Sequence, residues 1–519
     1  MTNQRLFSHG VFFNFLLFYP FVRFLAYNHY PLFTFEVVIP AFVTVCLLFI
    51  IAFFASQKQS RLALMYTFLI FWLILSLKSI FGFGVVALLA LGSLILYFFL
   101  RAVYEHLHSI IFLLIVGILV GDILILVQKH GDSSLAVHRS TPVDHSGSGS
   151  VLYFILDEHI GLDGMPQKMA GTAEMRQKLA DFYLNYGFTL FPKAYSNYYA
   201  TEDSLPNTLN GTYSVVHQEF YDKRKGKRFL SENKLFTTFK EKGYDIHVYA
   251  PDHIDFCNDF VSKCYRYNKN SPYAIFGTDF PWYEKSWILT SLYLQTNSLI
   301  RDLNKYTGNF AWMPKRTGAI QVIPDLFGEL NEDLKKDNGR TLYFMHILMP
   351  HSPYVYDDKC RVKPFNQWMN RVEFTGGVPK NTPEGHAERL RSYYAQIDCL
   401  NTFLAKTLEG LKREGLFDDV TLIVHGDHGS RIVLNYESYR EYADKISDED
   451  LIASHAALMA IKNKGQRTGK INNAMGSLTQ IVNGFLEGKE ILDDAHPVLY
   501  LVLKSGKDDV MVPRDMVRF

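Results

Sequence analysis

Five long apolar runs at the N-terminal end of the chain constrain its fold more than any other feature. Most of them approach the ~20 residues that an α-helix needs to cross a bilayer. No small-residue cleavage site follows the first run, so it is interpreted as a retained helix and not as a removed signal peptide. The sequence therefore predicts a multi-pass, membrane-embedded domain of about five transmembrane helices over residues 1–130. The runs span roughly 11–27, 33–54, 62–77, 81–100 and 109–127.

Basic residues near these runs predict the orientation of the domain. Arg5 precedes the first run, and Lys58 and Arg61 follow the second. Arg101 follows the fourth run. The positive-inside rule places these residues, and with them the N-terminus, in the cytoplasm. Five crossings then put everything after residue 130 outside, which indicates a protein of the inner (cytoplasmic) membrane with a periplasmic, or extracytoplasmic, catalytic domain.

A polar stretch separates the apolar region from the rest of the chain. Residues 131–150 end in an alternating Ser/Gly run at 146–150, a composition typical of a linker. No apolar stretch long enough to cross a membrane follows it, so residues 151–519 are predicted to form the extracytoplasmic domain. The formal net charge of the whole chain is +1, and nothing in it indicates a nucleic-acid partner.

Three short apolar runs in this second domain have the composition of buried β-strands. They span 151–156, 341–347 and 420–424, and the segment 387–414 has the periodicity of an amphipathic helix. Such an alternation predicts an α/β domain with a mostly parallel central sheet. Ligands of these sheets gather at the carboxyl ends of the strands, where each of the three runs ends in potential metal or phosphate ligands.

The cysteines agree with an extracytoplasmic location. Of the 5 in the chain, Cys46 falls in an apolar run. Cys257 and Cys264 are close enough in sequence to close a small loop, and the pairing of these two with Cys360 and Cys399 is left open. We expect one or two disulfides, formed in an oxidising compartment. The absence of a Cys-x-x-Cys pair disfavours a thiolate zinc site.

The tetrapeptide at 426–429, Gly-Asp-His-Gly, follows the third predicted strand. Asp427 offers hard oxygen and His428 offers imidazole nitrogen, a ligand set that zinc or manganese accepts. The flanking glycines allow unusual dihedral angles and close approach of the backbone. The alternative is an ordinary turn at a strand end.

Two further segments offer reactive groups. Asp157 and Glu158 end the first predicted strand, where two carboxylates either hold a divalent cation or are simply solvated. Thr201 begins a predicted helix, so its hydroxyl is either an N-cap or a nucleophile. Proximity to a metal ion and to the positive end of a helix dipole would favour the second role.

Together these segments resemble the alkaline phosphatase/sulfatase superfamily. Within it they are most similar to membrane-anchored phosphoethanolamine transferases and to lipoteichoic acid synthase-like phosphoglycerol transferases. The resemblance implies a sulfatase-like (alkaline phosphatase-like) α/β domain with one tightly bound divalent metal, Zn²⁺ or Mn²⁺, and leaves a second ion during turnover open. It implies that Thr201 is the nucleophile and that His351 and His455 contact the transferred group. The implied metal ligands are Asp157, Glu158, Thr201, Asp427 and His428.

The same resemblance implies a function. A head group of phosphoethanolamine or phosphoglycerol type would pass from a phospholipid donor to a cell-envelope acceptor through a phospho-threonine intermediate. No Cys/Ser-x-Pro-x-Arg motif surrounds Thr201, which disfavours sulfate-ester hydrolysis by formylglycine. The alternatives are a membrane-anchored hydrolase (phosphodiesterase, phosphatase or sulfatase) and a non-catalytic protein that keeps the fold. The head group, the acceptor and the oligomeric state are left open.

Overall fold

The chain folds as two units in the computed structural model. One comprises Met1–Ser134 with Asn270–Thr317, and the other comprises Leu135–Lys269 with Gly318–Phe519. Described residues are 19–26, 28, 30–55, 149–214, 220–222, 228–267, 273–296, 326–337, 339–368, 383–432, 447–489, 497–505 and 508–515.

The first unit contains α2 (Phe35–Ala55), α9 (Tyr273–Phe276) and α10 (Trp282–Thr296), and α10 packs against α2. No helix among the described residues has the length and apolar character needed to cross a membrane. The spans expected at 62–77, 81–100 and 109–127 lie outside the described residues, as do most of the run at 11–27 and of the linker at 131–150.

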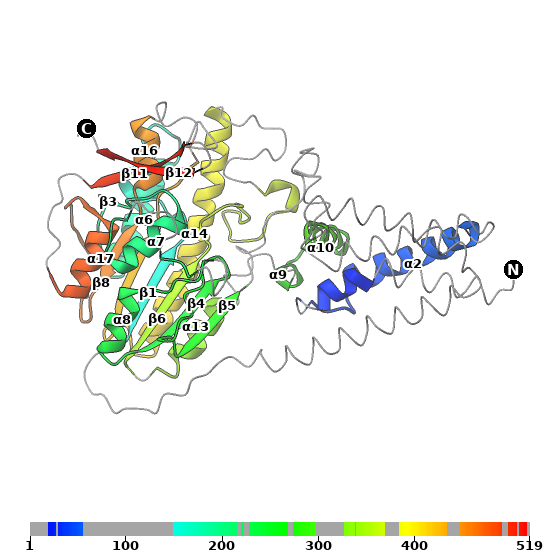
Figure 1. The fold of residues 1–519 in the computed structure, drawn as a ribbon, viewed down its shortest axis with the longest axis horizontal. Coiled ribbons are helices and arrows are strands. Elements are labelled where there is room, and N and C mark those ends of the chain that lie inside the picture. The colour runs from blue at the N-terminus through cyan, green and yellow to red at the C-terminus, as the bar shows by residue number, and fades with distance from the viewer. Residues whose placement is uncertain are drawn as a thin grey trace. The chain divides into compact units, whose positions relative to one another are not determined.

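The second unit is built on an eight-stranded sheet in the order β5-β4-β6-β1-β7-β8-β2-β9 (Figure 1). Every neighbouring pair is parallel except the two pairs that β8 makes with β7 and β2, so the predicted mostly parallel sheet is confirmed. The strands are β1 (Val151–Leu156), β2 (Thr189–Leu190), β4 (Asp245–Pro251), β5 (Lys263–Tyr267), β6 (Thr341–Ile347), β7 (Thr421–Gly426), β8 (Met459–Lys462) and β9 (Lys470–Ile471).

The three strands that the sequence predicts are the central neighbours β6, β1 and β7. Their side chains are almost all buried, as expected for strands covered on both faces. Leu156 at the end of β1 is level with Ile347 of β6 and Gly426 of β7. The residues that follow these strands therefore begin at the same edge of the sheet.

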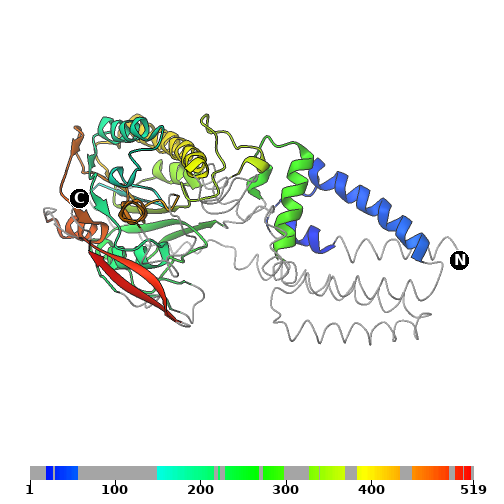
Figure 2. The same cartoon turned by 90° about the horizontal axis from the view of Figure 1, so that it is seen from above.

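Helices cover both faces of this sheet. The predicted helix at 387–414 is confirmed as α14, which lies with α6 on one side (Figure 2). On the other side α7, α8 and α17 contribute to a core cluster with the β1 residues Val151, Tyr153 and Ile155. The helices are α6 (Thr172–Asn185), α7 (Thr201–Asn210), α8 (Lys234–Glu241), α13 (Phe327–Leu334), α14 (Pro383–Arg413), α16 (Asp448–His455) and α17 (Leu478–Glu487).

Short elements complete the described part of the second unit. The hairpin of β11 and β12 is antiparallel, and β3 pairs with β10 in parallel. They are β3 (Ala194–Tyr195), β10 (Gly476–Ser477), β11 (Val498–Ser505), β12 (Asp508–Asp515) and the 3₁₀ helices η2 (Leu162–Gly164) and η4 (Phe365–Gln367).

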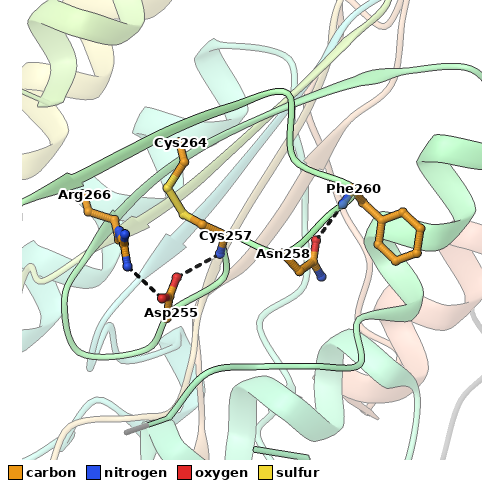
Figure 3. Close-up of a disulfide and its surroundings, with 6 residues drawn as sticks. All are labelled: Asp255, Cys257, Asn258, Phe260, Cys264 and Arg266. Carbon is orange, nitrogen blue, oxygen red and sulfur yellow. Dashed lines mark hydrogen bonds and ion pairs between the residues drawn. A yellow bond between two sulfur atoms is a disulfide. The ribbon is translucent and has the colours of Figure 1, made fainter. Parts of the chain in front are cut away.

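Two disulfides confirm the expectation from the cysteines. Cys257–Cys264 closes the turn between β4 and β5. Figure 3 shows Asp255 beside it, where the carboxylate accepts from the backbone N–H of Cys257 at 3.0 Å. Cys360–Cys399 ties the segment after β6 to α14, and Cys46 is free and exposed on α2.

Candidate active site

The Gly-Asp-His-Gly turn lies at the end of β7, tightly enclosed by other backbone. A Cβ atom on Gly426 would lie 2.3 Å from the carbonyl oxygen of His159, and one on Gly429 would lie 2.2 Å from that of Ala453. Neither glycine has the left-handed φ that would favour glycine on conformational grounds. Of the two reasons that the sequence offers for these glycines, close approach of the backbone is therefore the one that applies.

Asp427 is held by one carboxylate oxygen and presents the other. Its Oδ1 accepts hydrogen bonds from the backbone N–H groups of Glu158 at 2.7 Å and His428 at 2.9 Å. Among the described residues its Oδ2 has no hydrogen-bond partner, although the side chain is fully buried. Burial raises the pKa of Asp427 against the opposing effect of His428. A buried oxygen without a donor is suited to a cation.

His428 is oriented as a metal ligand would be. Its Nδ1 donates to the carbonyl oxygen of Gly429 at 2.8 Å, which leaves the lone pair on Nε2. Metal-binding histidines generally have their second nitrogen fixed in this way. This Nε2 lies 3.5 Å from Oδ2 of Asp427.

Asp157 completes a compact cluster with these two residues. One ligand atom from each of Asp157, Asp427 and His428 lies within 4.8 Å of the others, and all three side chains are buried. Oδ1 of Asp157 likewise has no hydrogen-bond partner within the described ranges. Burial would raise the pKa of Asp157, but the nearby His351 and His346 hold this pKa below its ordinary value. Two acceptor oxygens and one imidazole nitrogen fit a divalent metal ion.

Glu158, predicted as a ligand, takes a different position. Its backbone is left-handed, with φ of 64°, and its carboxylate does not join the cluster. Oε1 accepts from the backbone N–H and the Nε of Arg431, each at 3.3 Å, and Oε2 lies 3.7 Å from Nε2 of His351. Asp157, which precedes Glu158, is thus the carboxylate of the first strand that faces Asp427.

Thr201 is the first residue of α7 and is buried beside the cluster. Its Oγ1 lies 3.5 Å from Nε2 of His428. The helix is fastened to the same turn by Ser204, whose hydroxyl donates to the carbonyl oxygen of Asp427 at 2.5 Å. Gly211 ends the helix with φ of 69°. The N-terminus of α7 therefore places a hydroxyl and a positive helix dipole next to the predicted ligands.

His351 belongs to a loop after β6 that is fixed at both ends. Its backbone N–H donates to the carbonyl oxygen of Asp157 at 3.0 Å. The amide of Gln396 on α14 donates to the carbonyl oxygens of Pro350, His351 and Pro353 and accepts from the N–H of Val355 at 2.8 Å. One side chain of α14 thus holds the loop that carries His351.

His455 ends α16 and is fully buried. Its Nδ1 lies 2.9 Å from the carbonyl oxygen of Leu451. Its Nε2 lies 3.4 Å from the carbonyl oxygen of Tyr500 in β11. Burial lowers the pKa of His455 to about 4, and the ring is neutral at pH 7.

Several residues that shape the site have no signal in the sequence. Tyr393 donates to the carbonyl oxygen of Glu158 at 2.7 Å and accepts from the N–H of Ile160 at 2.9 Å, which stabilises the left-handed turn. Neither Tyr393 nor Gln396 belongs to a motif. Arg431 follows the Gly-Asp-His-Gly turn closely in sequence. A search for charged residues next to this turn could therefore have found Arg431.

Comparisons with known proteins give a family and a set of distant folds. A family model described as Sulfatase matches residues 154–487. No curated protein matches the chain. The phosphonate monoester hydrolase of Agrobacterium radiobacter is 16% identical, with a TM-score of 0.42, and the match covers 69% of this chain and 81% of that chain. The C-terminal periplasmic domain of EcEptC from Escherichia coli, in complex with Zn, is 12% identical, with a TM-score of 0.40 and coverage of 72% and 94%. Likenesses this low carry no inference about activity.

Proposed function

The chain belongs to the sulfatase family of the alkaline phosphatase-like superfamily, and we propose that it transfers a phospholipid-derived phospho-head group to a cell-envelope acceptor. The head group is of phosphoethanolamine or phosphoglycerol type. The observation that carries this proposal is the position of Thr201, whose hydroxyl lies 3.5 Å from Nε2 of His428 at the start of α7. A threonine cannot supply the formylglycine of sulfate-ester hydrolysis, but its hydroxyl can form a phosphoester.

Asp157, Asp427 and His428 would hold one divalent metal ion, Zn²⁺ or Mn²⁺. A bound ion of this kind supplies positive charge that lowers the pKa of a nearby hydroxyl and offsets charge on phosphoryl oxygens. Thr201 stands at the edge of this cluster and adds a further oxygen. In this arrangement Glu158 does not contact the metal ion, because its carboxylate is held by Arg431 and His351.

Thr201 attacks the phosphorus atom of the phospholipid head group. A bond forms between its Oγ1 and phosphorus, and the bond between phosphorus and the diacylglycerol oxygen breaks. The proton that the Thr201 hydroxyl gives up balances the one that this oxygen takes up to leave as diacylglycerol. The N-terminus of α7 stabilises the anionic group as it arrives, through the positive end of the helix dipole. The product of this half-reaction is phospho-threonine.

An acceptor hydroxyl then attacks the phospho-threonine and restores Thr201. His455 is suited to take the acceptor's proton, because a ring with a pKa of about 4 is neutral at pH 7. The backbone of His351 is fixed to the end of β1 through the carbonyl oxygen of Asp157. In this proposal the ring of His351 contacts the phosphoryl oxygens. Positioning of the reacting groups and stabilisation of charge thus account for most of the catalysis, as is usual in phosphoryl transfer.

Two features support an extracytoplasmic, membrane-anchored enzyme. The disulfides Cys257–Cys264 and Cys360–Cys399 are of a kind that persists in oxidising compartments. The apolar runs in residues 1–130 would keep the site close to the bilayer that contains the donor.

Replacement of the nucleophile tests the proposal. The full chain is incubated with vesicles that contain phosphatidylethanolamine or phosphatidylglycerol labelled in the head group. Intact-mass analysis should find a head-group phosphate adduct on the wild type, none on Thr201→Ala, and a slower one on Thr201→Ser. Turnover should be abolished in Thr201→Ala, whereas zinc content and melting temperature should be unchanged.

Retained turnover in folded, metal-loaded Thr201→Ala would contradict the proposal. Product analysis separates transfer from hydrolysis, because only transfer moves the label to an added acceptor. Release of the free phospho-head group in the presence of acceptor would identify a membrane-anchored hydrolase, in which water resolves the intermediate.

A further inference from the structure

His346 on β6 is a buried histidine whose polar atoms are not satisfied. It lies level with Ile155 of β1, and its side chain is inaccessible to solvent. In the part of the chain that the structure describes, neither Nδ1 nor Nε2 has a hydrogen-bond partner. Buried polar groups are almost always paired, so an exception in a central strand requires an explanation.

Among the described residues, the nearest carboxylate to this ring belongs to Asp157. Nε2 of His346 lies 3.6 Å from Oδ2 of Asp157, slightly beyond hydrogen-bond distance. The ring of Phe256 stands edge-on to that of His346, with centroids 5.9 Å apart. A small rotation of the Asp157 carboxylate would close the remaining distance.

A second histidine provides a comparison within the same sheet. His425 on β7 is also level with Ile155, on the opposite side of β1 from His346. Both of its ring nitrogens are satisfied, Nδ1 by the carbonyl oxygen of Gly426 at 2.7 Å and Nε2 by the hydroxyl of Tyr153 at 2.9 Å. His425 is thus structural by its contacts, whereas His346 is aimed at a predicted metal ligand.

We propose that His346 is a positioning residue for the metal site. Its Nε2–H donates to Oδ2 of Asp157 when a cation is bound, which orients the carboxylate and leaves Oδ1 for the ion. Oδ1 is already the oxygen without a partner. Residues behind a ligand act in this way in many metal sites, where they fix the orientation of the ligand. The proposal rests on the metal site of the proposed function and not on the transfer reaction.

The test measures metal affinity and not activity. The full chain is purified in detergent and stripped of metal, and binding of Zn²⁺ is measured by calorimetry. His346→Leu removes both nitrogens and should weaken binding about 10- to 100-fold, the range observed when such supporting residues are lost. His346→Gln keeps an N–H donor near the position of Nε2 and should retain most of the affinity. His346→Asn keeps an amide that is too short to reach Asp157 and should resemble His346→Leu.

His425→Gln is the matched control, because it changes an equally buried histidine at the same level of the sheet without touching Asp157. It should bind Zn²⁺ as the wild type does. The melting temperature of each metal-free variant shows whether it folds, and the pair His346→Gln and His346→Asn keeps the test decisive if His346→Leu does not.

Three results would overturn the inference. Equal affinities of His346→Asn, His346→Gln and the wild type would show that the contact with Asp157 is not used. Loss of a nitrogen ligand from the visible spectrum of the Co²⁺-loaded His346→Asn would make His346 a direct ligand. Failure of the wild type to bind Zn²⁺ or Mn²⁺ would overturn the metal site as well, and so is distinguishable from the first two.

Discussion

The candidate site has two sides that are built in different ways. The metal-facing side consists of Asp157, Asp427 and His428, and the histidine side consists of His351 and His455. Asp157, Asp427 and His428 come directly after the neighbouring strands β1 and β7, and all three are buried. His351 comes from a loop after β6, and His455 comes from the C-terminal end of α16. The first set depends on strand register, whereas the second depends on separate contacts with helices and backbone.

This difference has a physical consequence. Parallel register fixes the ends of β1 and β7 relative to each other, and Oδ1 of Asp427 further joins them by accepting from the N–H of Glu158. His351 and His455 are not joined to each other by strand register in this way. Gln396 holds the loop of His351, and the carbonyl oxygen of Leu451 orients His455. Changes on the strand side should therefore remove the metal, while changes on the histidine side should slow the reaction with the metal in place.

The largest effect is expected from Asp427→Asn. The amide can still accept through Oδ1, but it replaces the unpartnered Oδ2 with an N–H donor that repels a cation. Metal affinity, measured by titration of the stripped protein with Zn²⁺, should fall by more than the roughly 100-fold that loss of a supporting residue causes. Turnover should be lost with it.

Asp450→Asn is a control for this prediction, because Asp450 is a buried carboxylate that accepts from the Ser447 hydroxyl and lies outside the cluster. It should bind metal normally. If Asp427→Asn kept its metal, the strand-end cluster would not be the binding site.

The next effect, on rate alone, is expected from His455→Ala. Loss of a general base typically slows a reaction roughly 10²- to 10⁴-fold, and zinc content should be unchanged. A pKa lowered to about 4 means that His455 is neutral above that pH. The acceleration that His455 gives the wild-type enzyme should therefore be present above about pH 4 and be lost as the pH falls below this value. Zinc lost in step with the rate would place His455 on the metal side and break the comparison.

Gln396→Leu tests the contacts that hold the loop of His351 without removing a histidine. The substitution deletes the amide that bonds the carbonyl oxygens of Pro350, His351 and Pro353. Displacement of a catalytic group by about 1 Å can cost roughly 100-fold in rate, and we expect a loss of this order with normal zinc affinity. Steady-state kinetics beside zinc titration checks both expectations.

Gln396→Glu separates the two halves of this contact. It keeps the acceptor for the N–H of Val355 but loses the donors to the three carbonyl oxygens. It should fall between the wild type and Gln396→Leu. Wild-type rates in both variants would show that the loop is held by other contacts.

The same contrast explains how much of the site could be predicted from the sequence. A buried strand appears in the sequence as an apolar run followed by polar residues. The strands β1 and β7 and the candidate ligands Asp157, Asp427 and His428 are therefore visible as patterns. The left-handed turn at Glu158 is not, because it depends on Tyr393 from a helix far along the chain. Contacts of this kind are set by packing between elements, and no local period or motif encodes them.

His346 shows a different limit of sequence reasoning. A histidine in a buried strand is usually structural, and the sequence cannot distinguish His346 from His425, which lies level with it across β1. Only the contacts do so, since His425 is satisfied by Tyr153 and Gly426 whereas His346 faces Asp157.

The smallest effect on activity is expected from the disulfides, and it divides along the same boundary. Cys360–Cys399 connects the segment after His351 to α14, so its replacement by serines should loosen the histidine side and lower turnover less than the change at Gln396 does, with zinc affinity unchanged. Cys257–Cys264 connects the β4–β5 loop to β5 at the edge of the sheet, and its replacement should leave turnover as it is. Each loss should cost roughly 2–4 kcal/mol of stability, measured by denaturant unfolding. The two pairs differ in position and not in chemistry. Equal turnover in both variants would therefore show that the histidine side does not depend on Cys360–Cys399. The loop of His351 would then be held by Gln396 alone.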